Sequence, residues 1–218
     1  YVLFGQDFRG KLPIVGTEGD SDLTGTAGAD ALIGAQGDDI LNGAGGADVL
    51  RGGQGDDILG VLDLTFRQVA GGRGNDTLRL DGNGMALDLS AIPDVRITGI
   101  EEIDISGSGD NSLTIGTLQE ILNLSDTSNQ VVVRRDLGDT VAIGNGWTEV
   151  SPAAMDGEQF RVYVQGAATL LVENPPPALD LNGDDDDGVD FQTAFEEDQP
   201  AVAIVASDLT TVDETSLF

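Results

Sequence analysis

The sequence contains no cysteine and no histidine, and Lys11 is its only lysine. Without cysteine there are no disulfides, zinc–thiolate sites or thiol catalysis, and without histidine there is no imidazole base and no histidine metal ligand. Ser/His/Asp and Cys/His arrangements are therefore excluded, and no phosphate-binding GxxxxGK motif occurs. The ligands that remain are oxygen atoms, which suit hard cations such as calcium.

Basic residues and long apolar runs are also scarce. Ten basic residues against thirty-nine acidic ones give a net charge of −29, which repels nucleic acid and anionic lipid and attracts cations. No apolar run approaches the roughly 20 residues that span a bilayer. We therefore expect no nucleic-acid partner and no membrane insertion. The charge is interpreted as carboxylates neutralised by bound metal or, alternatively, as a solvated, salt-adapted surface. Because the chain opens on Tyr1 and shows no signal peptide, we expect a fragment of a longer protein.

Nine-residue units are the main feature of the sequence. Four follow one another between Gly25 and Gly60, each with glycine at positions one and four, aspartate at six and leucine at eight. A fifth unit occupies residues 71–79. The unit at 16–24 is degenerate, with serine at the aspartate position, and residues 61–70 keep nearly the length of a unit without its glycines. We interpret residues 61–70 as a half-turn that has lost its metal loop and kept its strand.

The residue types at these positions point to a cation site. Glycine accepts the positive φ values of tight reversals, which turn carbonyl oxygens inward, and aspartate adds a carboxylate where a strand begins. The predicted carboxylate ligands are Asp30, Asp39, Asp48, Asp57 and Asp76. The predicted loop glycines are Gly25, Gly28, Gly34, Gly37, Gly43, Gly45, Gly52, Gly55, Gly71 and Gly74. Asp38 and Asp56, at position five, are expected to face solvent. The alternative is Gly/Asp-rich turns on a solvated surface.

The five units resemble the RTX, or haemolysin-type, calcium-binding repeats of secreted bacterial proteins. This resemblance implies a right-handed parallel β-roll in which two units make one turn and the leucines at position eight fill the core. It further implies that Asp30 faces Asp48, that Asp39 faces Asp57, and that Asp57 approaches Asp76 across a longer interval. Each pair would hold one calcium ion together with loop carbonyls, so several Ca²⁺ ions are expected.

The second half of the chain carries short alternating apolar pairs at intervals close to one or two half-turns. They predict that the roll continues as a wider β-solenoid without calcium loops, although an antiparallel meander is an alternative. Thr117 and Glu120 form a capping-box pattern that predicts a short helix ending near Leu124. Residues 158–173 predict a terminal hairpin that turns at Gly166. The predicted fold class is all-β.

The expected organisation has five parts. They are an end strand of an upstream domain at 1–15, the calcium-binding roll at 16–82, the calcium-free extension and hairpin at 83–173, a Pro/Asp-rich linker at 174–188, and the start of a truncated domain at 189–218. YVLFG resembles the last strand of an FG-GAP propeller blade, and LDLNG with FEEDQPAVAI resembles the entry to a cadherin-like or immunoglobulin-like domain. RITGIEEIDISG resembles sequence that recurs between such modules. The acidic stretch from Asp180 to Asp186 resembles the start of an EF-hand loop, and a solvated linker is its alternative.

The resemblances imply a non-enzymatic, calcium-rigidified structural module of a secreted or cell-surface bacterial adhesin-like protein, exported by type I secretion. Expected partners are calcium and neighbouring domains of the same chain, with an unspecified cell-surface or glycan target. The alternatives are a β-roll accessory domain of a type I-secreted enzyme and a ligand-binding solenoid for glycans or ice. A carboxylate pair among Glu101, Glu102 and Asp104 could in principle cleave a glycoside. Surface charge is the favoured interpretation of these three residues.

Overall fold

The structure, a computed structural model, describes residues 11–125 and 128–175 of the 218-residue chain. The chain divides into two units, Tyr1–Ala178 and Leu179–Phe218, and all the described residues belong to the first. Several predictions lie outside the described residues: the strand in 1–10, the linker beyond residue 175, the EF-hand-like stretch and the truncated domain at 189–218. No helix in the described part is long and apolar enough to cross a membrane.

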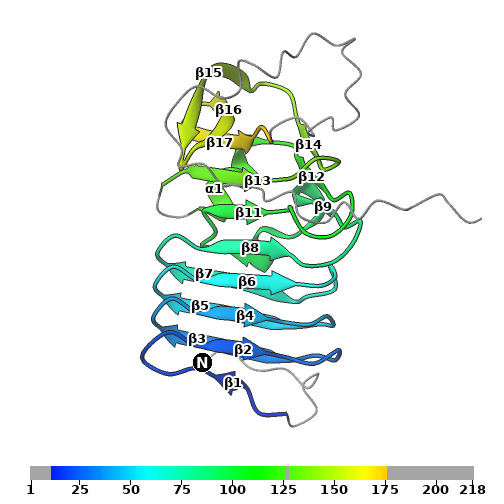
Figure 1. The fold of residues 1–218 in the computed structure, drawn as a ribbon, viewed down its shortest axis with the longest axis vertical. Helices are drawn as coiled ribbons and strands as arrows, with labels where there is room; N and C mark the ends of the chain where they lie inside the picture. The colour runs from blue at the N-terminus through cyan, green and yellow to red at the C-terminus, as the bar shows by residue number, and fades with distance from the viewer. Residues whose placement is uncertain (1–10, 126–127, 176–218) are drawn as a thin grey trace, which may run out of the picture. The chain divides into compact units, whose positions relative to one another are not determined.

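Successive strands alternate between two stacked parallel sheets (Figure 1). The first sheet contains β1 (Ile14–Val15), β3 (Ala31–Gln36), β5 (Val49–Gln54), β7 (Gln68–Arg73) and β10 (Ile97–Thr98). The second sheet runs parallel through β2 (Asp22–Thr24), β4 (Ile40–Asn42), β6 (Ile58–Val61), β8 (Thr77–Leu80), β11 (Glu102–Asp104) and β13 (Gln130–Arg134), and then continues into the C-terminal strands. This alternation is the predicted β-roll.

The nine-residue period becomes the register of both sheets. Leu32 lies beside Leu50 in the first sheet and Leu41 beside Leu59 in the second, and all four side chains are fully buried. Burying each leucine contributes roughly 1.5–3 kcal/mol, so one leucine per unit forms a continuous core. The interruption at 61–70 adds one residue, because Leu50 pairs with Val69 rather than with residue 68.

The roll begins earlier than we predicted. Ile14 and Val15, which we assigned to the end strand of an upstream domain, form β1 and pair in parallel with Leu32 and Ile33 of β3. They therefore belong to the first coil of the roll. The physical reason is that the first sheet gains an additional ladder of hydrogen bonds there, and Ile14 packs against the same core as the repeat leucines.

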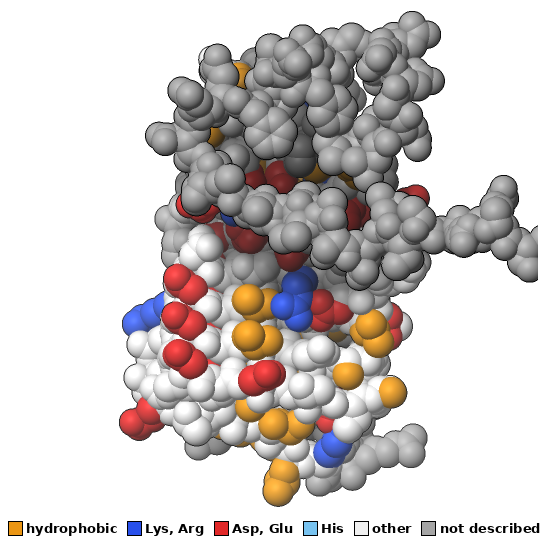
Figure 2. All heavy atoms as spheres, in the orientation of Figure 1, with side chains coloured by type: hydrophobic (Ala, Val, Ile, Leu, Met, Phe, Trp, Pro, Cys, Tyr) orange, Lys and Arg blue, Asp and Glu red, His pale blue; other side chains and the backbone are white. Residues whose placement is uncertain are grey.

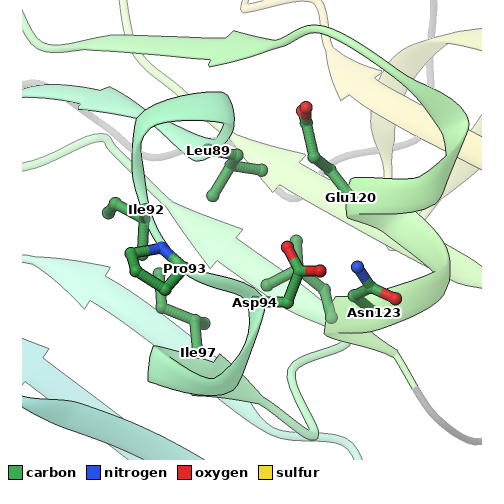
Figure 3. A pocket seen from close by; sticks show the side chains of 8 residues that line it. Leu89, Ile92, Pro93, Asp94, Ile97, Glu120 and Asn123 are labelled. Carbon is green, nitrogen blue, oxygen red and sulfur yellow. The ribbon is translucent and has the colours of Figure 1, made fainter.

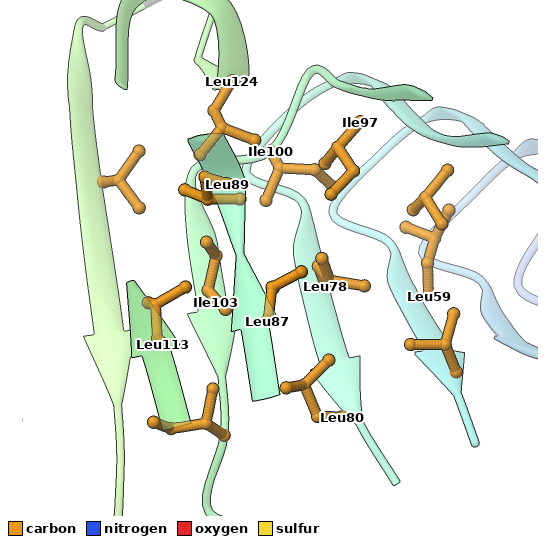
Figure 4. Close-up of a cluster of buried hydrophobic side chains, with 14 of the residues drawn as sticks. Leu59, Leu78, Leu80, Leu87, Leu89, Ile97, Ile100, Ile103, Leu113 and Leu124 are labelled. Atoms are coloured by element: carbon orange, nitrogen blue, oxygen red, sulfur yellow. The ribbon is translucent and has the colours of Figure 1, made fainter. Parts of the chain in front are cut away.

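Beyond β8 the coil widens and acquires a third sheet. This sheet contains β9 (Ala86–Asp88), β12 (Ser112–Ile115) and β14 (Thr140–Ile143), all parallel. Two 3₁₀ turns, Leu89–Ala91 and Asp94–Arg96, lead from β9 to β10. The core continues without a break from the roll into this extension, as Figure 4 shows for Leu59, Leu78, Leu87 and Ile103. The predicted wider solenoid is thus confirmed.

One short helix, α1 (Leu118–Leu124), follows β12 and packs against β10, β13 and β17. Only half of the predicted capping box forms. Thr117 caps no backbone N–H with its side chain, whereas the Glu120 carboxylate accepts the backbone N–H of Gly116 at 2.7 Å. Ile121 and Leu124 are buried in the core. The helix covers the coil where the first sheet ends at β10.

The described part of the chain ends in three strands, β15 (Thr148–Met155), β16 (Glu158–Gln165) and β17 (Ala168–Glu173). β17 runs parallel to β13, and β16 and β15 then add in antiparallel fashion. The predicted hairpin turns at Gly166, whose φ is +58°. Phe160 and Val162 pack with Val132 and Leu171 in a second small cluster outside the main core.

Candidate metal centre

The repeat aspartates stack in two columns, each aspartate immediately before a strand. The β4 column contains Asp39, Asp57 and Asp76, which precede β4, β6 and β8. The β3 column contains Asp30 and Asp48, which precede β3 and β5. The exposed fraction of these five side chains is 3% or less. The structure therefore brings together the pairs that the period predicts, 18 or 19 residues apart.

One carboxylate oxygen of each stacked aspartate locks the register of the coils. The backbone N–H of Asp39 donates to Oδ1 of Asp57 at 2.9 Å, and that of Asp57 donates to Oδ1 of Asp76 at 2.9 Å. In the β3 column the N–H of Asp30 donates to Oδ1 of Asp48 at 2.8 Å. These bonds satisfy backbone donors that lie beside the strands, and they need no metal.

The second oxygen has no such partner in the β4 column. Oδ2 of Asp39, of Asp57 and of Asp76 is buried and accepts no hydrogen bond. A buried, unpaired carboxylate oxygen is costly, and native structures rarely leave one without a compensating donor or cation. Each of these oxygens therefore lacks the donor or cation that a buried carboxylate oxygen normally has.

Carbonyl oxygens approach the same places. A Cβ added to Gly52 would collide with Oδ2 of Asp57 and would lie 2.7 Å from the carbonyl oxygen of Gly71 in the next coil. A Cβ on Gly34 would likewise meet Oδ2 of Asp39 and the carbonyl oxygen of Gly52. Each glycine at position one thus lies between a carboxylate and a carbonyl. A set made only of oxygen donors fits a hard cation such as calcium.

Burial and neighbouring carboxylates raise the pKa values of Asp48, Asp57 and Asp76. Burial, with repulsion from Asp39 as a further cause, raises the pKa of Asp57 to about 6. The same two causes, burial first and then the charges of Asp57 and Glu101, raise the pKa of Asp76 to about 7. Burial also raises the pKa of Asp48 to about 6. The columns therefore favour a bound positive charge.

A known repeat family matches this arrangement. Its description, RTX calcium-binding nonapeptide repeat (4 copies), matches residues 14–41, 24–59 and 68–83. Residues 14–59 and 68–83 are RTX calcium-binding repeats. The RTX segment thus begins at β1 and ends just after β8, and its repeats bind Ca²⁺ ions. A repeat of this kind is a calcium-binding structural element and not a catalytic one.

Comparison with solved structures finds the crystal structure of the extracellular lipase LipA from Serratia marcescens, with a TM-score of 0.22 and 16% sequence identity. The similarity covers 74% of this chain and 38% of the lipase chain, so the chain spans well under half of that protein. A TM-score this low does not establish a shared fold. No curated protein is significantly similar to the chain in sequence.

Glycines of the RTX loops take the backbone conformations expected of position four. Gly37, Gly55 and Gly74 have φ values of +99°, +120° and +137°, which other residues adopt only with strain. In the unit of residues 43–51, Gly46 occupies position four with a φ of +106°, whereas we had named Gly45, which occupies position three. The other predicted glycines are Gly25, Gly34, Gly43, Gly52 and Gly71 at position one and Gly28 at position four. Unlike the other position-four glycines of the five units, Gly28 does not have a positive φ.

Asp30 differs from the other RTX aspartates because both of its carboxylate oxygens have protein donors. The Lys11 ammonium contacts Oδ1, and the backbone N–H and hydroxyl of Thr26 both donate to Oδ2 at 2.7 Å. Burial alone would raise the pKa of Asp30, but the hydrogen bonds from Lys11 and Thr26 lower it below its ordinary value. Of the five RTX aspartates, Asp30 has the least need of a metal ion.

The position-five aspartates line the surface, as predicted. Asp38 and Asp56 are exposed, and the backbone N–H of Asp56 donates to Oδ1 of Asp38 at 2.8 Å. Asp20 accepts the N–H of Asp38 in the same way. Acidic side chains stacked on the surface of the roll are visible in Figure 2.

Sequence reasoning missed Glu101. We interpreted it as surface charge, but only 6% of its side chain is exposed, and it takes the next place in the β4 column after Asp76. The backbone N–H of Asp76 donates to Oε2 of Glu101 at 3.1 Å. The missed signal is the spacing, because Glu101 precedes buried Ile103 by two residues, as Asp76 precedes Leu78.

A third ladder of polar side chains runs along the extension, through Asn111 and Asp139. Oδ1 of Asn111 accepts the backbone N–H of Met85 at 2.8 Å, and Oδ1 of Asp139 accepts that of Asn111 at 2.7 Å. The Asn111 amide Nδ2 donates to the carbonyl oxygen of Ile105 at 3.0 Å. The oxygen and the nitrogen of the Asn111 amide are thus both bonded within the protein, whereas the aspartates of the β4 column leave Oδ2 unpaired.

Two further observations bear on the chemistry. Among residues 11–125 and 128–175, no group of three or more His, Cys, Asp or Glu side chains is placed to hold a metal. A small pocket beside α1, shown in Figure 3, has a volume of about 20 Å³, roughly enough for one water molecule. Its lining residues are Leu89, Ile92, Pro93, Asp94, Ile97, Glu120, Asn123 and Leu124.

Proposed function

We propose that this chain is a calcium-rigidified structural module of a secreted or cell-surface bacterial adhesin-like repeat protein. One observation carries the calcium-dependent part of the proposal: three stacked, buried aspartates of the β4 column each direct an unpaired oxygen toward the loop of their own coil. No protein donor compensates them. A module of this kind is rigid only where calcium is available, which is the case outside the cell. The secreted context is supported by the RTX repeats.

The residues of the column would connect one coil to the next. Asp39 and Asp57 would hold one ion, and Asp57 and Asp76 a second, with carbonyl oxygens of loop glycines such as Gly52 and Gly71 completing each site. Bound calcium supplies the positive charge that turns repulsion between successive carboxylates into attraction. Without it, carboxylates this close repel by roughly 1–4 kcal/mol, depending on the local dielectric.

Stiffness follows from this arrangement. Each coil of the roll buries little more than two leucines, so a single coil is marginal and depends on its neighbours. Calcium that binds only the folded state adds about 2.7 kcal/mol per site at a hundredfold excess over its dissociation constant. A roll with several sites is therefore a rod that forms cooperatively and keeps its neighbouring domains at a fixed separation.

The proposal is tested by hydrogen exchange and circular dichroism of the whole chain with and without calcium. In a chelator we expect the backbone protection of residues 16–82 to fall and the far-UV β signal to weaken, with both restored by calcium and not by equal magnesium. A spectrum and exchange pattern unchanged by the chelator would refute the calcium-rigidified roll. Pulling single molecules in an optical trap tests the mechanical part, because calcium should raise the unfolding force of the roll.

A further inference from the structure

We propose that Asp76 and Glu101 hold an additional calcium ion where the roll joins the extension, outside the RTX units. This inference rests on the proposed calcium-rigidified roll. The two carboxylates come from side chains of different length, because a glutamate stands where the next aspartate of the β4 column would be expected. The ligand class of the site is a hard divalent cation bound by oxygen.

The contacts that Asp76 makes toward the next coil repeat those of Asp39 and Asp57. Its side chain is fully buried, and its Oδ2 has no hydrogen-bond partner. Its backbone N–H donates to a carboxylate oxygen of the next coil, here Oε2 of Glu101 at 3.1 Å, as that of Asp57 does to Asp76 at 2.9 Å. The ladder of backbone N–H groups bonded to carboxylate oxygens therefore continues through Glu101.

Carbonyl oxygens are also placed as in the RTX sites. A Cβ added to Gly71 would lie 2.5 Å from Oδ2 of Asp76 and would collide with the carbonyl oxygen of Gly99 in the next coil. The equivalent atoms one coil earlier are Oδ2 of Asp57 and the carbonyl oxygen of Gly71. Gly99 has a φ of +60°, so the chain reverses there without an RTX loop.

The strand register places Glu101 beside Asp76 although the coil between them is longer, because Glu102 pairs with Thr77 as Ile58 does. Asp76 and Glu101 are 25 residues apart, against 18 or 19 between the RTX aspartates, and Gly99 precedes Glu101 by two residues where a complete RTX loop is missing. The Glu101 carboxylate accepts the amide of Asp76 across this register. An ion at this place would join β8, the last RTX strand, to β11, the first strand of the extension in the same sheet.

Glu101→Gln tests the site, because glutamine keeps an acceptor for the Asp76 amide and removes the charge. Its matched control is Glu102→Gln, which removes the neighbouring carboxylate that accepts a bond from Arg134 Nε at 3.3 Å and lies outside the column. Native mass spectrometry in saturating calcium counts the bound ions. We expect Glu101→Gln to bind one ion fewer than the unmodified chain, and Glu102→Gln to bind the same number. Equal counts and equal affinities in all three proteins would overturn the proposal.

A second measurement serves if Glu101→Gln does not fold. Crystals of the unmodified chain with terbium in place of calcium give anomalous peaks at each occupied site. A peak about 2.3–2.6 Å from oxygens of both Asp76 and Glu101 supports the junction site. Peaks between Asp39 and Asp57 without one at the junction overturn this inference alone. No peak anywhere in the column would refute the proposed function as well.

Discussion

Asp57 offers the sharpest test of how the roll depends on calcium, because it belongs to two predicted sites. Its Oδ1 accepts the N–H of Asp39, and its Oδ2 is buried without a partner beside Gly52. The substitution Asp57→Asn keeps the first acceptor and replaces the second oxygen by an amide nitrogen. That nitrogen can donate to a carbonyl, as Nδ2 of Asn111 does to Ile105. We therefore expect its effect on stability to change sign with calcium.

The contacts of Asp57 set the expected change in the free energy of unfolding. Without calcium, the variant removes one buried unsatisfied acceptor, which is worth about 1–3 kcal/mol, so the roll becomes more stable. In calcium at a hundredfold excess, it impairs the Asp39–Asp57 and Asp57–Asp76 sites. Each of these is worth about 2.7 kcal/mol, so the free energy of unfolding falls by roughly 5 kcal/mol.

Chemical denaturation followed by circular dichroism measures both values on the same protein, once in a chelator and once in calcium. Asp56→Asn is the matched control, because Asp56 is the exposed neighbour that accepts the N–H of Asn75. It should shift stability little, and equally in both conditions. If Asp57→Asn destabilises the roll in the chelator as much as in calcium, its unpaired oxygen is not a cation ligand and the account of the β4 column is wrong.

Three other outcomes are expected. Lys11→Met should let the chain bind one more calcium ion, because Asp30 loses its ammonium partner, whereas Lys11→Arg should leave the number of bound ions unchanged. Native mass spectrometry counts the ions, and equal numbers for both variants would contradict the role given to Lys11. Asn111→Asp should lower the stability of the metal-free chain by about 1–3 kcal/mol, because a carboxylate oxygen then faces the carbonyl oxygen of Ile105. An unchanged midpoint of thermal unfolding in a chelator would contradict this prediction. The metal-free roll should become more stable as pH falls from 8 to 5, because the folded pKa values of Asp57 and Asp76, about 6 and about 7, lie above the ordinary 3.8. Stability from such groups is present below the unfolded pKa and lost as pH rises through the folded one, so thermal unfolding in a chelator that is flat between pH 5 and 8 would rule this out.

The repeat period predicted most of the roll because it fixes two things at once. Leucine at position eight sets the core, and aspartate at position six sets the ladder, so Leu41 and Asp39 are found where a nine-residue count places them. The extra residue at 61–70 could also be predicted, because a count in units of nine shows it. The widening beyond β8 was readable only from alternating apolar pairs, which do not reveal that a third sheet forms.

The site residues that the sequence did not predict either have no RTX loop before them or contact residues far away in the sequence. Glu101 keeps its spacing to Ile103, but no RTX loop precedes it, so local pattern gave no reason to separate it from surface acids. Asn111 follows two glycines, yet an amide at the aspartate position was not recognised as equivalent. The contact of Lys11 with Asp30 joins residues in different coils, and nothing in the sequence around Lys11 indicates it.

The amide of Asn111 has a consequence for the order in which the coils assemble. Its hydrogen bonds to Met85 and Ile105 form without any ion, so the C-terminal coils can be in place before calcium is present. The calcium-dependent coils can then wind onto β11 one after another, from β8 toward β2. Pulsed hydrogen exchange after mixing with calcium would show β8 protected before β4 if this is the order. Growth would then be directional, with the metal-free half acting as the template on which the calcium-dependent half is built.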